Sequence, residues 1–240
     1  MQTNILYPMT YSDDMIISLR KGNAKIGRSV YAFNLLPGDE PISVKTKGQL
    51  TDIQGTCGGC CEGCVNACYA MRDAKRFHPS CIPSLGKNTL IMRHNMDGMF
   101  EQLKKKLARR KAKVLRYHSS GEIESFNYLL HMVKLAVEMP GTKFYCYTKR
   151  FAFVQKYLTE YGMFPKNLTV NISVWNGNDK GYDFSKLNKF VYDDGSDPEV
   201  AKLFHCKAVD KNGKSTELTC DKCGRCFNGN KGLITAVYAH

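Results

Sequence analysis

The chain has 240 residues, of which 43% are hydrophobic, and it contains 11 cysteines. A chain of this length and composition can bury a core of its own, which excludes the class of small secreted proteins that depend on disulfide bonds for stability. Its 35 basic and 22 acidic residues give a net charge of +13, which favours a polyanionic partner or an anionic ligand.

The amino-terminal segment has no features of an export signal. No basic stretch is followed by an apolar run there, and nowhere in the chain do 18 apolar residues follow one another. The odd number of cysteines also excludes complete disulfide pairing. We therefore expect a reduced, cytoplasmic protein that does not enter a membrane. No linker or repeat divides it, which favours a single domain over residues 1–240.

The first part of the chain, residues 1–56, is rich in β-forming residues, and residues 29–35 and 42–45 are predicted strands. A cysteine-rich segment, residues 57–81, follows. Closely spaced thiolates are soft ligands that suit zinc or iron–sulfur clusters. The segment holds six cysteines: Cys57, Cys60, Cys61, Cys64, Cys68 and Cys81.

The spacing in this segment fits two sets of ligands. Cys57, Cys61 and Cys64 form a C-x3-C-x2-C pattern, while Cys57, Cys64 and Cys68 form C-x6-C-x3-C. Either set leaves one coordination position without a cysteine, which is typical of a catalytic rather than a structural metal site. Cys60 or Cys81 could equally close the site.

Helical periodicity predicts a helix over residues 96–111, with an apolar stripe and a strongly basic remainder. The basic side chains continue through residues 104–116. They indicate either a solvated helix face or a nucleic-acid-binding surface. The basic residues are Lys104, Lys105, Lys106, Arg109, Arg110, Lys111, Lys113 and Arg116.

Strands and helices then alternate through the central segment, residues 82–200. Predicted strands at 113–117, 143–147 and 168–175 are separated by predicted helices at 125–138 and 150–161, with further strands at 189–192 and 232–238. This alternation is the pattern of a parallel α/β fold, in which functional side chains gather at the carboxyl ends of the strands.

Polar residues follow three of these strands. After the first come His118, Ser119, Ser120, Gly121 and Glu122. Thr148, Lys149 and Arg150 follow the second, and Trp175, Asn176 and Asn178 follow the third. His118 is a candidate proton shuttle or cluster ligand, or it bonds a loop backbone. Glu122 is a candidate ligand-binding carboxylate, or it favours the start of the next helix. Lys149 is a candidate partner for a carboxylate or phosphate, or a solvated charge.

The second cysteine group lies in the last segment, residues 201–240. Cys220, Cys223 and Cys226 form a C-x2-C-x2-C pattern, and Cys206 is available as a fourth thiolate. Four thiolates close a site, and this spacing suits zinc and a four-iron cluster equally well. Cys146, alone in a predicted strand, is expected to be a buried small hydrophobe.

These motifs together resemble the phage "gene product 88 domain" family, from residue 23 to the end of the chain. The similarity rests on Thr56-Cys57, Cys64-x3-Cys68-Tyr69-Ala70, the segments 116–122 and 144–149, and the closing cysteines. It implies that Cys57, Cys64 and Cys68 are the ligands of the first site. Because the family is a phage family, the resemblance also implies that the protein is located in the cytoplasm of an infected host cell.

A more distant resemblance is to radical S-adenosylmethionine (SAM) enzymes. These proteins bind a four-iron cluster with three cysteines, leave one iron open for SAM, and use a Gly-Gly-Glu motif after the next strand to hold the amino group of SAM. Ser120-Gly121-Glu122 is similar to that motif, with Ser120 in place of the first glycine, while Gly63 stands where an aromatic residue usually precedes the last cysteine. The resemblance implies a partial (β/α) barrel with cysteine-rich loops near both ends.

We therefore expect an iron–sulfur protein with one or two 4Fe-4S clusters. The resemblance implies that Ser119, Ser120, Gly121, Glu122 and Lys149 bind SAM, that His118 and Glu122 act in catalysis, and that the substrate is one the sequence does not specify. The alternative is a zinc-stabilised nucleic-acid-binding protein, in which both cysteine groups are structural and residues 104–116 contact the nucleic acid.

Overall fold

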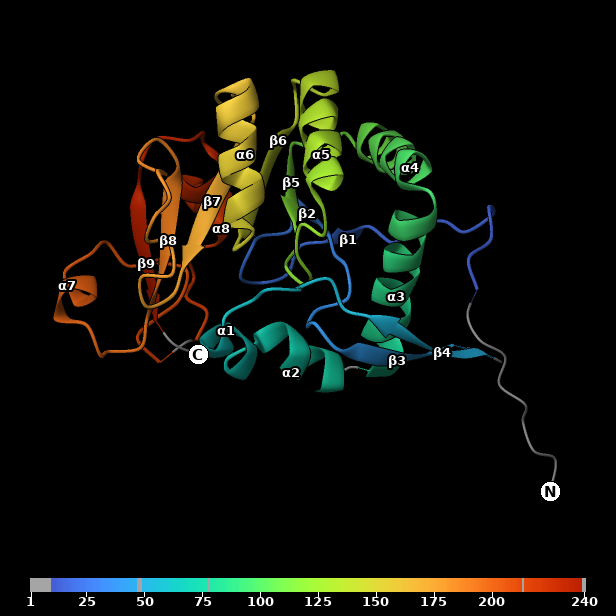
Figure 1. Cartoon of the computed structure of the whole chain (residues 1–240), viewed down its shortest axis with the longest axis horizontal. Coiled ribbons are helices and arrows are strands. Elements are labelled where there is room, and N and C mark those ends of the chain that lie inside the picture. Colours follow the sequence, from blue (N-terminus) through green and yellow to red (C-terminus); the bar gives the residue numbers. More distant parts are fainter. Residues whose placement is uncertain (1–9, 47–48, 77, 213, 239–240) are drawn as a thin grey trace.

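A computed structural model describes residues 10–46, 49–76, 78–212 and 214–238. Its centre is a seven-stranded sheet in the order β1-β2-β5-β6-β7-β8-β9. The short strand β1 pairs antiparallel with β2, and every other neighbouring pair is parallel. Apart from the step from β2 to β5, the parallel strands lie in the sheet in the order in which they occur in the chain, and their carboxyl ends share one edge (Figure 1).

The sheet strands are β1 (Arg20–Lys21), β2 (Val30–Phe33), β5 (Val114–Tyr117), β6 (Lys143–Thr148), β7 (Leu168–Val174), β8 (Asn188–Asp193) and β9 (Ile234–Tyr238). A separate antiparallel hairpin consists of β3 (Pro41–Thr46) and β4 (Gln49–Gln54). The helices are α1 (Glu62–Asn66), α2 (Tyr69–Arg76), α3 (His78–His94), α4 (Met96–Arg109), α5 (Phe126–Glu138), α6 (Phe151–Tyr161), α7 (Pro198–Ala201), α8 (Cys220–Cys223) and the 3-10 turn η1 (Arg225–Phe227).

Helices α4, α5 and α6 cover one face of the sheet and form the main core with it (Figure 1). The predicted apolar stripe of α4 is buried there, at Met99, Phe100, Leu103 and Leu107. The opposite face carries a smaller core, in which Phe227 of η1 packs on Tyr145 of β6 with ring centroids 5.3 Å apart. No helix of comparable length covers this face in the described part of the chain, so it is available for a site.

The segment between β2 and β5 leaves the sheet and returns to it. The β3–β4 hairpin packs against α3 in a third small core, and α1 and α2 lie across the carboxyl-end edge of the sheet (Figure 1). At Gly86 a Cβ atom would lie 2.8 Å from the side chain of Val44, so glycine permits the close approach of helix and hairpin.

The predicted α/β fold with a mostly parallel sheet is confirmed, and each predicted strand or helix from residue 96 onward has a counterpart. The sheet of the described residues is open, with β1 and β9 at its edges, and does not close into a barrel. The partial (β/α) barrel of radical SAM enzymes stays a prediction. In the described regions, none of the helices has both the length and the apolar character required to span a bilayer.

Candidate functional site

The floor of the candidate site consists of strand residues on the face that α4–α6 leave open. Side chains alternate between the two faces of a strand, and Leu115 and Tyr117 of β5 are buried in the core under the helices. Arg116 therefore points to the opposite face. By the same alternation Tyr147 of β6 and Ser173 of β7 lie on that face, and all three residues line one cavity.

This cavity has a volume of about 490 Å³ and lies at the carboxyl end of the sheet. Its walls come from the cysteine loop after β4, the loop after β5, the ends of β6–β8 and the cysteine-bearing segment between β8 and β9. The sequence offers thirteen candidate ligand and site residues, and all of them except Cys223 and Cys226 line this cavity. The eleven lining residues are Cys57, Cys64, Cys68, His118, Ser119, Ser120, Gly121, Glu122, Lys149, Cys206 and Cys220.

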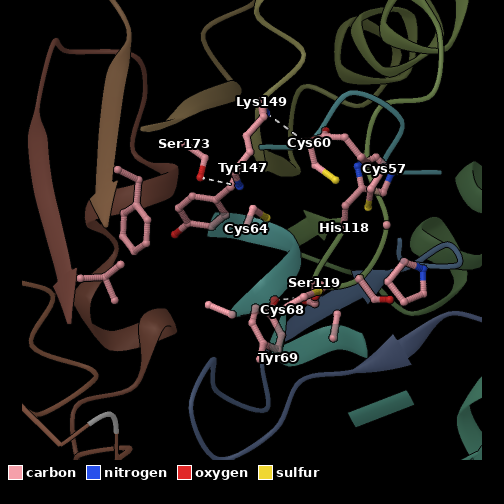
Figure 2. Close-up of a pocket in the computed structure, with 18 of the residues that line it drawn as sticks. Cys57, Cys60, Cys64, Cys68, Tyr69, His118, Ser119, Tyr147, Lys149 and Ser173 are labelled. Carbon is pink, nitrogen blue, oxygen red and sulfur yellow. Dashed lines mark hydrogen bonds between the residues drawn. The ribbon is translucent and has the colours of Figure 1, made fainter. Parts of the chain in front are cut away.

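The first cysteine loop is held at the cavity by backbone bonds. The amide of Cys57 donates to the carbonyl of Gly38 at 2.8 Å, and the amide of Cys60 donates to the carbonyl of Cys57 at 3.0 Å. Figure 2 shows Cys57, Cys60, Cys64 and Cys68 around the cavity. Cys60 thus joins the three predicted ligands as a fourth thiol.

Two other cysteines of the segment lie elsewhere. Cys61 is the N-cap residue of α1 and does not line the cavity. Cys81 belongs to α3 and accepts a hydrogen bond from Nη1 of Arg20 at 3.3 Å. The placement of these thiols favours the Cys57, Cys64 and Cys68 set over the set that contains Cys61.

Packing against Trp175 explains why a glycine, Gly63, precedes Cys64. A Cβ atom at this position would lie 3.3 Å from Cε3 of Trp175. The indole ring from the loop after β7 therefore occupies the space that an aromatic side chain at position 63 would take.

The second cysteine group is anchored to the loop before β2. The amide of Cys220 donates to the carbonyl of Lys25 at 3.1 Å, and the carboxylate of Asp221 accepts from the hydroxyl of Ser29 at 2.6 Å. Gly224 ends α8 with φ of 70°, a left-handed conformation that turns the chain toward Cys226. The amide of Cys206 donates to the carbonyl of Ala236 at 2.8 Å, which ties it to β9.

The thiols of each group influence one another. Burial is the main cause that raises the pKa of Cys226 to about 12; a hydrogen bond from Tyr147 opposes the rise, and the nearby thiols of Cys206, Cys220 and Cys223 add to it. In the first group, burial raises the pKa of Cys64; Lys149 lowers it, and the charge of Cys68 raises it. These raised values mean that a bound cation is needed to hold the thiols as thiolates near neutral pH.

The donor set fits a soft metal or an iron–sulfur cluster, because two groups of neighbouring thiols lie on one cavity. The geometry is not that of an assembled centre: among the residues described, no three His, Cys, Asp or Glu side chains converge in a way that would hold a metal ion. Cys57, Cys64 and Cys68 would supply the ligands at the first site, with the thiol of Cys60 also on the cavity. Cys206, Cys220, Cys223 and Cys226 would supply them at the second.

His118 adopts a left-handed backbone conformation with φ of 58° at the end of β5. Its Nε2 lies 3.0 Å from the hydroxyl of Tyr128, and its Nδ1 has no hydrogen-bond partner among the described residues. Burial, followed by the charge of Arg116, lowers the pKa of His118 to about 3. The imidazole is therefore neutral near pH 7.

The rest of this loop is fixed by backbone bonds. The amide of Ser119 donates to Oδ1 of Asn34 at 2.8 Å, and the hydroxyl of Ser120 donates to the carbonyl of Leu35 at 3.0 Å. Gly121 has φ of 84°, and a Cβ atom there would lie 2.8 Å from Thr56 Oγ1. Only glycine fits this position.

Glu122 connects two loops instead of pointing freely into the cavity. Its Oε1 accepts the amide of Ile123 at 2.7 Å and its Oε2 accepts the amide of Lys149 at 2.9 Å. Burial raises its pKa, and these bonds oppose the rise. The N-cap of α5 is Ser125, which accepts from the amide of Tyr128 at 3.1 Å. Glu122 therefore does not make the direct cap of that helix.

Lys149 and Arg150 have different surroundings at the end of β6. Nζ of Lys149 donates to Oγ of Ser173 at 3.0 Å and lies 5.1 Å from the centre of the Trp175 ring (Figure 2). The guanidinium of Arg150 donates to three carbonyls: that of Ile123 at 3.0 Å, that of Glu124 at 3.0 Å and that of Gly58. Arg150 thus links the loop after β5 to the first cysteine loop.

Comparison with known proteins shows the family of this chain. The family model described as "Gene product 88" matches residues 17–229. The chain belongs to this family. No curated protein and no solved structure shows a significant match to it. The match covers strands β1 to β8, both cysteine groups and all of the cavity lining except Val237, so the site belongs to the region that defines this Gene product 88 protein.

The sequence did not point to several residues of the Gene product 88 cavity, namely Lys25, Tyr147, Ser173 and Tyr192. Arg116 was assigned to the basic surface after α4, but it lies in β5 and lines the cavity. A parallel strand covered on both faces reads as a continuous apolar run. The charged residue Arg116 within the otherwise buried segment 114–117 is the signal that one face is functional.

Proposed function

We propose that this Gene product 88 protein binds an iron–sulfur cluster at the first cysteine group and a structural metal centre, either zinc or a second cluster, at the second group, and that the first cluster acts on a ligand held in the cavity. The observation that carries the proposal is the cavity itself, because thiols of both groups line it together with the loop after β5. A redox-active centre needs access to its ligand, whereas a purely structural metal site does not.

The chemistry around the first cysteine group supports a cluster over a single zinc ion. The described residues of the loop offer four thiols on the cavity and a fifth at Cys61, more than a tetrahedral ion requires. The ammonium of Lys149 lies beside Cys64 and lowers its pKa. A cation in this position stabilises the net negative charge that thiolate-bound clusters carry.

The second group supports either metal. Four thiolates are sufficient for a closed zinc site and for a closed four-iron cluster. Cys223 is exposed, while Cys226 is half-buried and bonded by Tyr147. We assign this group a structural role, because it ties the segment before β9 to the loop before β2.

The more specific form of the proposal is a SAM-dependent radical enzyme of unspecified substrate. SAM bound to an open iron would supply radical chemistry. The loop Ser119–Glu122 lines the cavity beside the cysteines, where it would orient the amino acid part of SAM. Glu122 would do so mainly by fixing the loop, since both of its oxygens already accept backbone amides.

Anaerobic reconstitution tests the cluster and its ligands together. We expect wild-type protein to contain iron and acid-labile sulfide and to show cluster absorption. Cys68→Ser should lose the iron of the first site, whereas Cys61→Ser should retain it, because Cys61 is off the cavity and serine is a good helix N-cap. Zinc in both sites of iron-replete protein would overturn the proposal.

Two further outcomes refine the assignment. Loss of iron in Cys61→Ser but not in Cys68→Ser would reassign the ligands to Cys57, Cys61 and Cys64. Reduced, iron-loaded protein that neither binds SAM nor cleaves it to 5'-deoxyadenosine would remove the SAM-dependent form, while the iron and sulfide content would still decide whether a cluster is present.

A further inference from the structure

Arg116 lies on the cavity floor without an acidic partner. None of the ion pairs among the described residues includes it, although seven other pairs are present. Its Nη2 is 3.4 Å from the hydroxyl of Tyr69, and its guanidinium lies 5.0 Å from the centre of the Tyr147 ring. Its Nε is buried and has no acceptor among the described residues. A buried guanidinium nitrogen without an acceptor is costly, so an acceptor is expected in the cavity.

A second cation lies close to Arg116. Lys25 lines the same cavity from the loop before β2, and it too is absent from the described ion pairs. Lys25 and Arg116 therefore place two cations on the wall of one enclosed space. Like charges at close range in a half-buried site repel each other unless an anion lies between or beside them.

The side chains that line the cavity carry more positive than negative charge. Its lining includes the basic residues Lys25, Arg72, Arg116, Lys149 and Arg150, against the carboxylates Asp73 and Glu122. Arg150 is fully engaged with carbonyls and Lys149 with Ser173, whereas Arg116 retains an unused donor. The hydroxyl of Ser119 is a further buried group on this wall with no partner in the described regions.

We propose that the cavity binds a small ligand through an oxyanion group, a carboxylate or a phosphate, which Arg116 contacts, with Lys25 and Ser119 as further donors. The planar fork of arginine suits both groups, because each presents two oxygens to its donors. This inference rests on the proposed function, since the cysteine loops that bind the clusters form two walls of the cavity. It adds the chemical class of the ligand.

The competing explanation is that Arg116 and Lys25 only neutralise thiolates. Cys220 lies close enough to affect the electrostatics of both residues, and Cys206 affects Lys25. On that explanation, removal of Arg116 would release metal from the second site. On the proposed one, its removal would leave the metal content unchanged and abolish anion binding.

The experiment measures both quantities on the same preparations. Iron-loaded protein is titrated by calorimetry at constant ionic strength with inorganic phosphate and, separately, with succinate, and its iron and sulfide are determined. The single tryptophan, Trp175, lines the cavity and stacks on Tyr192 with ring centroids 3.8 Å apart. Its fluorescence should therefore change with the same midpoint as the heat, which places the bound anion in this cavity.

Arg110, which belongs to the same basic segment 104–116 as Arg116, provides a matched control. Arg110 also lies over a tyrosine ring, 5.3 Å from the centre of Tyr31, and donates to the carbonyl of Leu19 at 3.0 Å, but it does not line the cavity. We expect Arg116→Gln to weaken anion binding by about tenfold or more, as the loss of a charge-assisted bond predicts. Arg110→Gln should bind as wild type. Arg116→Lys, which keeps the charge but loses the fork, should fall between them.

The affinities measured in the phosphate and succinate titrations identify which of the two oxyanion groups the cavity prefers. Saturable binding of neither probe to iron-loaded wild type would overturn the inference, as would equal affinities of wild type and Arg116→Gln. Loss of iron from Arg116→Gln or Arg116→Lys would overturn it in favour of thiolate neutralisation. Wild-type protein without iron would instead contradict the proposed function, whatever its affinity for either anion.

Discussion

His118 is a buried histidine that stays neutral, and this makes it a source of acid sensitivity. Its pKa falls from the ordinary 6.5 to about 3 in the folded chain, because burial disfavours the imidazolium and Arg116 repels it. Between these two values the unfolded chain binds a proton at this residue and the folded chain does not. The free energy of unfolding should therefore decrease by about 1.4 kcal/mol for each unit by which the pH is lowered within that window.

The variant His118→Asn should remove this dependence, because asparagine tolerates the left-handed backbone and does not titrate. Thermal unfolding followed by circular dichroism at several pH values from 7.5 to 5 would measure the difference between wild type and variant. We expect the difference to change as the pH falls below about 6.5. A constant offset at every pH would contradict this account of His118.

Arg150 is a second residue with a specific expected effect. Its guanidinium bonds carbonyls of the loop after β5 and of Gly58 in the first cysteine loop. Arg150→Lys keeps the charge but makes at most part of these contacts, so it should lower the free energy of unfolding by about 2 kcal/mol. The loosened loop should also lose iron faster to a chelator. Arg109→Lys, on the exposed face of α4, is the control, and equal effects of both variants would contradict the role of Arg150.

At the residue scale, the sequence located the loops of the site better than its floor. His118, Lys149 and most of the candidate cysteines could be predicted, because they follow strands or share short spacings. Arg116 could not, because its position in a basic run concealed the strand alternation that turns it inward. The contacts of Glu122 with two backbone amides depend on how two loops pack together, which no local pattern encodes.

Part of the basic run after residue 103 is engaged in contacts within the protein. Lys104 pairs with Glu138 at 2.9 Å, Arg110 lies over Tyr31, and Arg116 is inside the cavity, while Lys105 and Arg109 are exposed on α4. A nucleic-acid-binding surface requires several free cations on one face.

We therefore expect no steeply salt-dependent binding of DNA or RNA by α4. The double variant Lys105→Gln/Arg109→Gln should change the free energy of unfolding by no more than about 0.5 kcal/mol, as is usual for exposed positions. Fluorescence anisotropy with labelled duplexes at 50 and 200 mM salt is the measurement. Tight binding at low salt that the double variant loses would instead support the nucleic-acid alternative.

The elements themselves were predictable where periodicity is strong. Helices α4, α5 and α6 and strands β5–β7 each bury a regular pattern of apolar residues in one core. Helix α3 was not predicted. It contains Pro83 and Gly86, which weaken a helical pattern, and its conformation depends on packing against the β3–β4 hairpin.

For the whole molecule, the second cysteine group should affect stability more than the first. It joins the loop before β2, at one side of the sheet, to the segment that leads into β9 at the other. Because metal binding by a closed set of thiolates couples to folding, Cys223→Ser should lower the melting temperature by at least about 5 °C. Cys81→Ser, outside both groups, should change it little. Similar decreases in both variants, measured by scanning calorimetry on metal-loaded protein, would contradict the assignment.

The order of the strands also has a consequence in time. From β5 to β8, each strand pairs with the next one along the chain, so these pairings close shorter loops than the pairing of β2 with β5 does. The pairing of β2 with β5 instead encloses residues 34–113, which include the hairpin and the first cysteine loop. Long-range pairing is entropically costly and slow. Refolding should therefore begin in β5–β7 and add β2 late, so that the first cysteine loop becomes able to receive the proposed cluster only after most of the sheet has formed.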